Sequence, residues 1–250
     1  ESAWLRERGV SVPEKSVAYS LNEGLFGTTI GGKETHDPSH VPPQEAYTMT
    51  VAPAAARAEP EELVLASERG LPVALDGQAL SGVALIEELN RRCRPHGVGR
   101  GIHIGDTILG LKGRIAFEAP APLILIKAHR ELAKLVTTKW QAHWLDSAGN
   151  FYGMLLHEGL DYDPVMRDLE ALLDSANERV EGDVRVRLFR GSHEVVGVRS
   201  PHSLLDPDVA VYGEGATAWT GAQAAGFARI HGLPSRVPAA GDAPPNDEGR

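Results

Sequence analysis

The chain has 250 residues, of which 42% are hydrophobic and 24% charged, which is typical of a soluble globular protein long enough to bury a sizeable core. Its net charge of −9 and its aromatic share of 6% argue against nucleic acid as a partner, because phosphate binding needs clustered basic residues and base stacking needs aromatic ones. A single cysteine, Cys93, excludes a disulfide framework and a four-cysteine zinc site, and no apolar run approaches the ~18 residues of a membrane span. With no signal peptide visible, these features indicate a cytoplasmic protein without a membrane anchor.

The first part of the chain is predicted to be poor in regular structure. Residues 1–8 are typical of the end of a helix that stops at Gly9, and residues 10–19 of an extended segment. Because the chain does not open on Met, we expect it to be a piece of a longer protein. Residues 20–45 combine many Gly, Thr, Asp, Pro and His with little periodicity, which predicts a long loop, and loops of that length are often functional. Tyr47–Val51 is then predicted to form a strand.

Two short strands and a helix are predicted next. Apolar runs indicate strands over Leu63–Ala66 and Pro72–Leu75. Ser81 is expected to cap a helix that Gly97 ends. Because Cys93 falls on the apolar face of this helix, we expect its side chain in the core.

The following segment predicts a hairpin and then a long helix. Ile102–Ile104 and Ile108–Leu111 are expected to pair around a turn at Gly105–Asp106, and residues 117–122 to break the chain. Residues 123–144 have the apolar periodicity of one long helix.

The last elements are predicted from caps and from alternation. Gly149–Asn150 is expected to interrupt the helical run, and Asp163–Pro164 to start a further helix. The strict alternation of VRVRL at residues 184–188 predicts a strand that pairs with Glu194–Val198. A last helix is predicted over Gly221–Ile230.

The order of these elements predicts the fold class. Strands, then long helices, then strands again indicate an α+β fold, with a mixed or antiparallel sheet and long packed helices, rather than an alternating βαβ series. The tail from Pro238 (PAAGDAPPNDEGR) has no apolar pattern and is predicted to be disordered.

Two glycine-rich runs are poor matches to nucleotide-binding motifs. Gly27–Glu34 nearly spells a phosphate-binding loop, but Glu34 stands where a Ser or Thr should hold magnesium, so a small nucleotide hydrolase is the least favoured function. Gly97–Gly101 follows a predicted helix rather than a strand, which is the wrong order for a dinucleotide fingerprint. No metal site is predicted, since a proline separates His36 from His40 and keeps them off one helix face.

Four segments, in the right order, resemble argininosuccinate synthase. The first two are Val12–Glu34, similar to the family's Y-S run, and Arg69–Arg100, which follows the family's G-V-P-V-A-L-x-G, helix, H-G-V-G-R order. The other two are Gly110–Leu135, similar to the family's G-x-K-[SG]-R-x-x-[YF]-E-x-P segment, and Arg179–Asp208, similar to its closing strands and S-P-x-S-L turn. Together they cover nearly the whole chain to about residue 236 and identify it as a member of the family.

The resemblance implies a division of the chain. Residues 11–236 would be the family's C-terminal synthetase and oligomerisation domain, residues 1–10 the end of the preceding domain's last helix, and residues 237–250 a disordered tail. The family's S-G-G-x-D-[ST] loop for the ATP phosphates does not occur in this chain. ATP and its magnesium are therefore expected mainly on an N-terminal ATP-binding domain, and the implied assembly is a homotetramer.

The implied activity is a carbon–nitrogen ligation in arginine biosynthesis. In the family, the ureido oxygen of citrulline attacks the α-phosphate of ATP and pyrophosphate leaves; the amine of aspartate then displaces AMP to give argininosuccinate. This chain would supply the citrulline-contacting and oligomerising half, and would be inactive alone. The alternative is a non-catalytic, stand-alone module for oligomerisation or amino-acid binding.

The resemblance also implies four citrulline contacts. Ser20 is the serine of the family's Y-S run, and Thr29 is the later hydroxyl of that run. The family's Glu after H-G-V-G-R is replaced by Gly105, and its neighbour Asp106 is the expected substitute. Phe117 stands in the place of the family's Tyr and lacks the hydroxyl. No catalytic, cofactor-binding or metal-binding residue is assigned within the chain.

Overall fold

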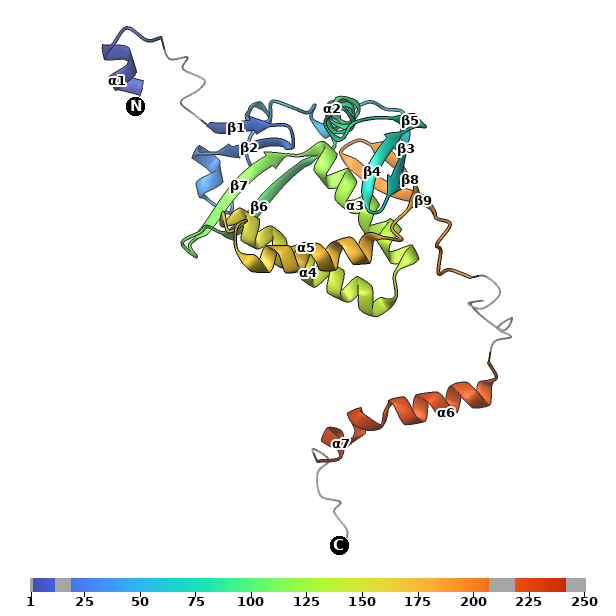
Figure 1. Ribbon diagram of the computed structural model, residues 1–250. Helices are drawn as coiled ribbons and strands as arrows, with labels where there is room; N and C mark the ends of the chain where they lie inside the picture. The colour runs from blue at the N-terminus through green and yellow to red at the C-terminus, as the bar shows by residue number, and fades with distance from the viewer. Residues whose placement is uncertain (1, 12–18, 207–218, 242–250) are drawn as a thin grey trace, which may run out of the picture. The chain divides into compact units, whose positions relative to one another are not determined.

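The computed structural model describes residues 2–11, 19–206 and 219–241 (Figure 1). By its internal contacts the chain divides after Leu204 into two units, which are described separately. The chain begins with helix α1 (Ser2–Glu7), as predicted, and Gly9 has the left-handed conformation (φ +74°) that commonly ends a helix. Most of the extended segment expected over residues 10–19 lies outside the described residues.

Among its described residues, the first unit folds into two antiparallel sheets with helices packed against them (Figure 1). The strands are β1 (Ser20–Gly24), β2 (Gly27–Gly31), β3 (Glu61–Glu68), β4 (Leu71–Leu75), β5 (Gln78–Ala79), β6 (Arg100–Asp106), β7 (Lys112–Glu118), β8 (Gly182–Phe189) and β9 (Ser192–Arg199). The helices are α2 (Gly82–Cys93), α3 (Pro120–Val136), α4 (Lys139–His157) and α5 (Pro164–Asn177), with the short 3₁₀ helices η2 (Lys33–His36), η3 (Gln44–Ala46), η4 (Pro53–Ala55) and η5 (Arg94–His96). The strand orders β1-β2-β7-β6 and β5-β4-β3-β8-β9 confirm the α+β class.

The main core lies between the five-stranded sheet and helices α2 and α3. The predicted alternation in β8 is confirmed, since Val184, Val186 and Leu188 are buried and the arginines between them are exposed. Burying each such side chain stabilises the fold by about 1.5–3 kcal/mol. Cys93 lies in this core, as predicted, and its burial raises the pKa of the thiol to about 12. Helix α3 also contacts β2, so it touches both sheets.

The helices after the core are divided differently from the prediction. The single helix expected over residues 123–144 is wrong, because α3 and α4 are separate helices. Thr138 starts α4 through reciprocal hydrogen bonds with Gln141, a capping box that is a strong local start signal. Helix α4 runs through Gly149–Asn150, where an interruption was expected, since a glycine inside a helix costs only about 1 kcal/mol. Helix α5 begins after Asp163, as predicted.

The segment predicted as a long loop, residues 20–45, begins instead with a hairpin. Strands β1 and β2 pair with each other, and β2 also pairs with β7. Gly27 permits this close approach, because a Cβ atom there would lie 2.1 Å from the carbonyl oxygen of Glu118. All five residues of β1 are exposed, so this edge strand lacks the apolar alternation from which a strand is predicted.

The strand predicted over Tyr47–Val51 is absent, and the segment is irregular. Its three central backbone amides bind a side chain rather than a neighbouring strand. The amides of Thr48, Met49 and Thr50 donate to the carboxylate of Glu118 over 2.7–2.8 Å. A carboxylate distant in the sequence thus replaces the ladder that a strand would need.

The hairpin expected over residues 102–111 is present, but its turn lies elsewhere. Strand β6 continues through Gly105 and Asp106, and Ile108–Leu111 belongs to the turn rather than to the second strand. The break expected over residues 117–122 is also wrong in part, because β7 extends to Glu118 and α3 starts at Pro120. The predicted pairing of residues 184–188 with residues 194–198, in contrast, is confirmed as β8 and β9.

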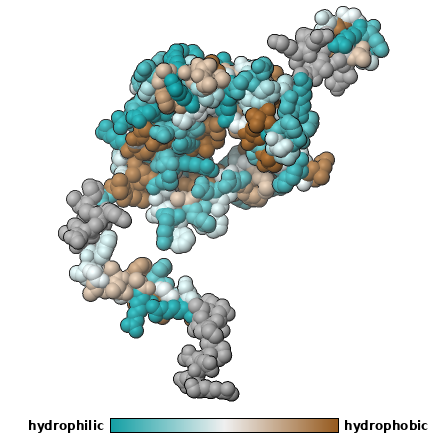
Figure 2. Space-filling model, turned by 180° about the vertical axis from the view of Figure 1, so that it is seen from behind, coloured by the Kyte–Doolittle hydropathy of each residue, from teal (hydrophilic) through white to brown (hydrophobic). Residues whose placement is uncertain are grey.

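Hydrophobic side chains also reach the surface of the first unit, as Figure 2 shows for one face. Trp140 and Trp144 on α4 are 67% and 62% exposed. None of the helices in the described ranges combines the length and the apolar content that a membrane span requires.

The second unit contains helices α6 (Gly221–His231) and α7 (Leu233–Gly241). Helix α6 confirms the predicted last helix, and Thr220 caps it through a capping box with Gln223. Helix α7 includes the first residues of the tail that was expected to be disordered, while residues 242–250 lie outside the described residues.

Candidate functional site

One face of the four-stranded sheet brings predicted site residues together. In the antiparallel register Thr29 lies opposite Asn22 on one side and Phe117 on the other, and Phe117 lies opposite Gly101. Residues directly opposite one another point to the same face of a sheet. Asn22, Thr29, Phe117 and Gly101 therefore form one row across the strands β1, β2, β7 and β6.

Ser20 belongs to the same face. It lies opposite Gly31, which is two residues from Thr29 on β2, and side chains two residues apart in a strand share a face. On β6, two residues beyond Gly101, His103 lies opposite Ile115 by the same alternation. We call the surface formed by Ser20, Asn22, Thr29, Phe117 and His103 the Thr29 face.

The Thr29 face presents mainly polar groups to solvent. Ser20, Asn22, Thr29 and His103 are exposed, whereas Phe117 is half-buried. The side-chain amide of Asn22 donates a long hydrogen bond of 3.5 Å to the hydroxyl of Thr29. These hydroxyl and amide groups can each donate and accept hydrogen bonds toward a small polar ligand.

The ring of Phe117 lies across strand β6. A Cβ atom at Gly101 would stand 2.3 Å from the Cζ atom of this ring, so the glycine leaves the space that the ring occupies. A ring in this position offers an apolar surface on the same face as the hydroxyl of Thr29. It can pack against the methylene groups of a ligand, but it cannot donate a hydrogen bond.

Asp106 is not brought to this face. Asp106 lies five residues beyond Gly101 on β6, so its side chain points away from the Thr29 face. Its cross-strand partner on β7 is Lys112. The Lys112 ammonium is 2.6 Å from the Asp106 carboxylate. Of the two neighbours Gly105 and Asp106, it is Gly105 that lies on the Thr29 face.

On the opposite face of the sheet, side chains of β7 bind the chain segment of residues 34–50. Glu118 is fully buried, and its carboxylate accepts hydrogen bonds from three backbone amides of residues 48–50 and from the hydroxyl of Thr50. The Arg100 guanidinium lies 3.9 Å from this carboxylate and donates to the Thr50 hydroxyl over 2.7 Å. The buried charge is thus compensated by hydrogen bonds and by a cation.

Arg114 fastens the earlier part of the same segment. Its guanidinium donates to the backbone carbonyls of Glu34, Asp37 and His40 over 2.7–2.9 Å. Arg114 and Glu118 were missed in the sequence, although their spacing in KGRIAFE places both on the face opposite Phe117. They fix residues 34–50 against β7, and so hold the strand that presents Phe117.

The run Gly27–Glu34 nearly spells a phosphate-binding loop, but its first five residues form strand β2 and so do not wrap an anion. Beyond this strand, the Glu34 carboxylate accepts a hydrogen bond of 2.6 Å from the hydroxyl of Tyr19. This bond raises the pKa of Tyr19 to about 12 and lowers the pKa of Glu34. Glu34 is therefore ionised near neutral pH and would repel a phosphate.

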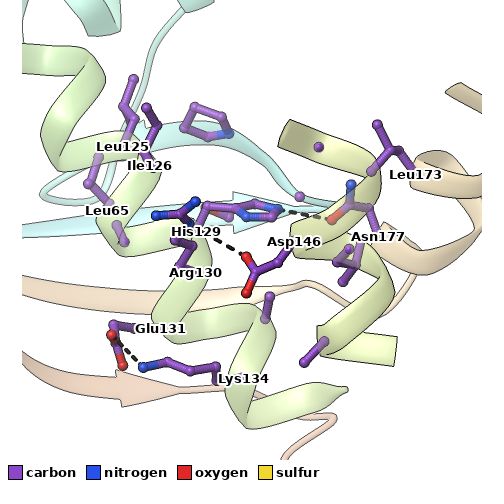
Figure 3. Close-up of a pocket in the computed structure, with 18 of the residues that line it drawn as sticks. Leu65, Leu125, Ile126, His129, Arg130, Glu131, Lys134, Asp146, Leu173 and Asn177 are labelled. Carbon is purple, nitrogen blue, oxygen red and sulfur yellow. Dashed lines mark hydrogen bonds and ion pairs between the residues drawn. The ribbon is translucent and has the colours of Figure 1, made fainter. Parts of the chain in front are cut away.

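A separate cavity of about 810 Å³ is lined by helices α3, α4 and α5 and by the turn between β3 and β4 (Figure 3). Its histidine and its charged side chains have partners within the lining. The Nε2 atom of His129 lies 2.9 Å from Oδ1 of Asn177, and the Arg130 guanidinium lies 3.8 Å from the Asp146 carboxylate. Because these groups already have partners, we assign no chemistry to this cavity.

The fold and the Thr29 face define an α+β domain with an exposed, polar sheet surface suited to a small polar ligand. Comparison with known proteins then identifies the family. Residues 19–238 match the family described as Arginosuccinate synthase C-terminal domain, and the chain belongs to this family. The matched range includes all four residues that were expected to contact citrulline.

Individual relatives support this assignment. The chain is 40% identical to the argininosuccinate synthase of Crocosphaera subtropica over 230 residues, which are 92% of this chain and 57% of that protein. It is 37% identical to the argininosuccinate synthase of Methanocaldococcus jannaschii over 233 residues, which are 93% of this chain and 58% of that protein. The chain thus spans less than two thirds of the length of these relatives.

Proposed function

We propose that this chain is the citrulline-contacting and self-associating part of an argininosuccinate synthase. The whole enzyme would join citrulline to aspartate at the expense of ATP, in arginine biosynthesis in the cytoplasm. The observation that supports this most directly is the shared face of Ser20, Thr29 and Phe117, which come from three different strands. Residues 11–236 would form the functional domain, residues 1–10 the end of a preceding helix, and residues 237–250 a tail.

On this proposal the Thr29 face binds and orients citrulline. The hydroxyls of Ser20 and Thr29 would hydrogen-bond to the polar groups of the amino acid. The ring of Phe117 would pack against its methylene chain, which fixes the direction of the ureido group. Holding the reacting oxygen in a defined place lowers the activation barrier of a reaction that joins two substrates. Asp106 could reach citrulline only from outside the Thr29 face, because its side chain lies on the opposite face and pairs with Lys112.

Within the described residues, no group of three or more His, Cys, Asp or Glu side chains could hold a metal ion. The nearest match to a phosphate loop, Gly27–Glu34, begins with the strand β2 and ends on an acidic residue. We therefore propose that ATP and magnesium bind to a part of the longer protein outside this chain, and we derive no step through them.

Self-association into a homotetramer is the second part of the proposal. Trp140 and Trp144 lie one turn apart on α4 and are largely exposed. Helix α6 has no buried residue, and its Phe227 and Ile230 are 67% and 70% exposed. Contacts between copies would remove this apolar surface from water.

The test of the ligase proposal is pyrophosphate release. The full-length protein that contains this chain should release pyrophosphate from ATP only when citrulline is present, and should form argininosuccinate once aspartate is added. The purified chain alone should release none above background. A full-length protein that binds citrulline but never releases pyrophosphate would favour the alternative, a non-catalytic amino-acid-binding module.

A further inference from the structure

His103 lies on the Thr29 face, and in the part of the chain that the structure describes its side chain makes no contact that would explain it as a structural residue. It lies on β6, at the edge of the four-stranded sheet, and its side chain is exposed. Within the described ranges, no hydrogen bond or ion pair involves its imidazole. Among the residues that the four strands place on this face, His103 is also the only one with a titratable side chain.

Two glycines on β6 shape the surface around it. A Cβ atom at Gly105 would lie 2.3 Å from the Nε2 atom of His103, so the imidazole lies along the strand, over Gly105. A Cβ atom at Gly101 would collide in the same way with the ring of Phe117. The two glycines of G-I-H-I-G, residues 101–105, therefore each leave room for a ring above the strand. The ring over Gly101 is that of Phe117, and the ring over Gly105 is the imidazole of His103.

We propose that His103 is a further substrate-binding residue of the Thr29 face, and that Gly105 positions it by leaving room for the ring. The inference rests on the proposed citrulline site. The hydroxyls of Ser20 and Thr29 are uncharged, whereas a free amino acid has both an ammonium and a carboxylate group. A neutral imidazole has one donor and one acceptor nitrogen, so it can donate to the carboxylate or accept from the ammonium.

The structure also explains why Gly105, and not only His103, matters. An alanine at position 105 keeps the backbone, but its methyl group occupies the place of the Nε2 atom. The imidazole must then rotate away, since it is the free end of a flexible side chain. Gly105→Ala therefore removes the ring from its place without removing it from the protein.

The experiment is steady-state kinetics of the full-length protein, with citrulline, aspartate and ATP varied in turn. His103→Ala should raise the citrulline KM by roughly 10-fold or more, as expected for a lost hydrogen bond to a charged group, and leave the ATP KM unchanged. Gly105→Ala should raise the citrulline KM in the same direction. His157→Ala, at an exposed histidine on α4, is the matched control and should change nothing.

A double variant separates displacement of the ring from simple obstruction. If Gly105→Ala acts by moving the imidazole, then adding it to His103→Ala should have no further effect. An unchanged citrulline KM in His103→Ala would overturn the inference about His103, while the ligase proposal stands. Full additivity of the two substitutions would also overturn this inference. A wild-type protein that does not use citrulline at all would overturn the proposed function, and this inference with it.

Discussion

Phe117 and Glu118 are neighbours on β7 that serve opposite faces of the same sheet. The ring of Phe117 lies over Gly101 on the Thr29 face, while the carboxylate of Glu118 is buried on the other side and binds the amides of residues 48–50. The alternation of a strand thus joins a side chain of the proposed ligand-binding face directly to a structural anchor.

The first prediction concerns this anchor. Glu118→Ala should lower the free energy of unfolding by about 3–5 kcal/mol, because it leaves the amides of residues 48–50 without their acceptor and removes the negative charge beside the Arg100 guanidinium. Glu118→Gln should cost less, since one oxygen remains to accept. Urea unfolding of the chain measures both values. Glu23→Gln is the control, because Glu23 lies in the same cross-strand row but is exposed, and it should stay within about 0.5 kcal/mol of wild type.

The same contact shows why one part of the fold could not be predicted from the sequence. Tyr47–Val51 looks like a strand, but a carboxylate about 70 residues further along the chain binds its amides. Propensity reports only local preference, and this tertiary contact overrides it. Strands β1 and β2 escaped prediction for a related reason, since β1 is exposed along its whole length and has no apolar side.

Two elements with strong local signals were predicted correctly. The alternation in β8 and the Asp163–Pro164 start of α5 each depend on residues that lie next to one another in the chain. The candidate site shows the same limit. Ser20, Thr29 and Phe117 could be named from resemblance, but only the register of the sheet shows that they share a face and that Asp106 does not. For His103, which we propose in addition, the glycines two residues away on either side were the available signal in the sequence.

The second prediction concerns the single cysteine. Burial favours the neutral thiol of Cys93 and raises its pKa from 9.0 to about 12. Iodoacetamide should therefore modify the folded chain very slowly at pH 8 and the urea-unfolded chain rapidly, as mass spectrometry would show. Equal modification rates in the two states would mean that Cys93 is not held in the core.

The sign of the accompanying pH dependence follows from the same shift. Above about pH 9 the unfolded thiol loses its proton while the folded one keeps it, so the unfolded state binds fewer protons. The contribution of Cys93 to stability is thus complete below pH 9 and falls as the pH rises toward 12. Cys93→Ala should remove this part of the alkaline decline, and the comparison of wild type with Cys93→Ala isolates it from other groups.

The third prediction concerns assembly. The isolated chain should have a mass in solution greater than the 26.8 kDa of one copy, because α4 and α6 expose large apolar side chains. Light scattering at micromolar concentration measures this mass. Trp140→Ser combined with Trp144→Ser should shift the distribution toward the monomer if α4 lies in the interface. A clean monomer for the wild-type chain would contradict the proposed self-association.

The last prediction concerns the hydroxyls of the Thr29 face in the full-length protein. Ser20 is exposed on an edge strand, so Ser20→Ala should leave the fold intact and remove one hydrogen bond to citrulline. Such a bond to a charged ligand group is worth about 1.5–3 kcal/mol, so the citrulline KM should rise by roughly 10- to 150-fold. Thr29→Ala should act in the same direction but more weakly, since Asn22 already donates to this hydroxyl, and Thr29→Ser should be nearly silent because it keeps the hydroxyl. The ATP KM should change little in all three variants, because the proposed ATP site lies outside this chain. If Ser20→Ala instead raised the ATP KM, or left the citrulline KM unchanged, the Thr29 face would not be the citrulline site, even though the chain belongs to the family.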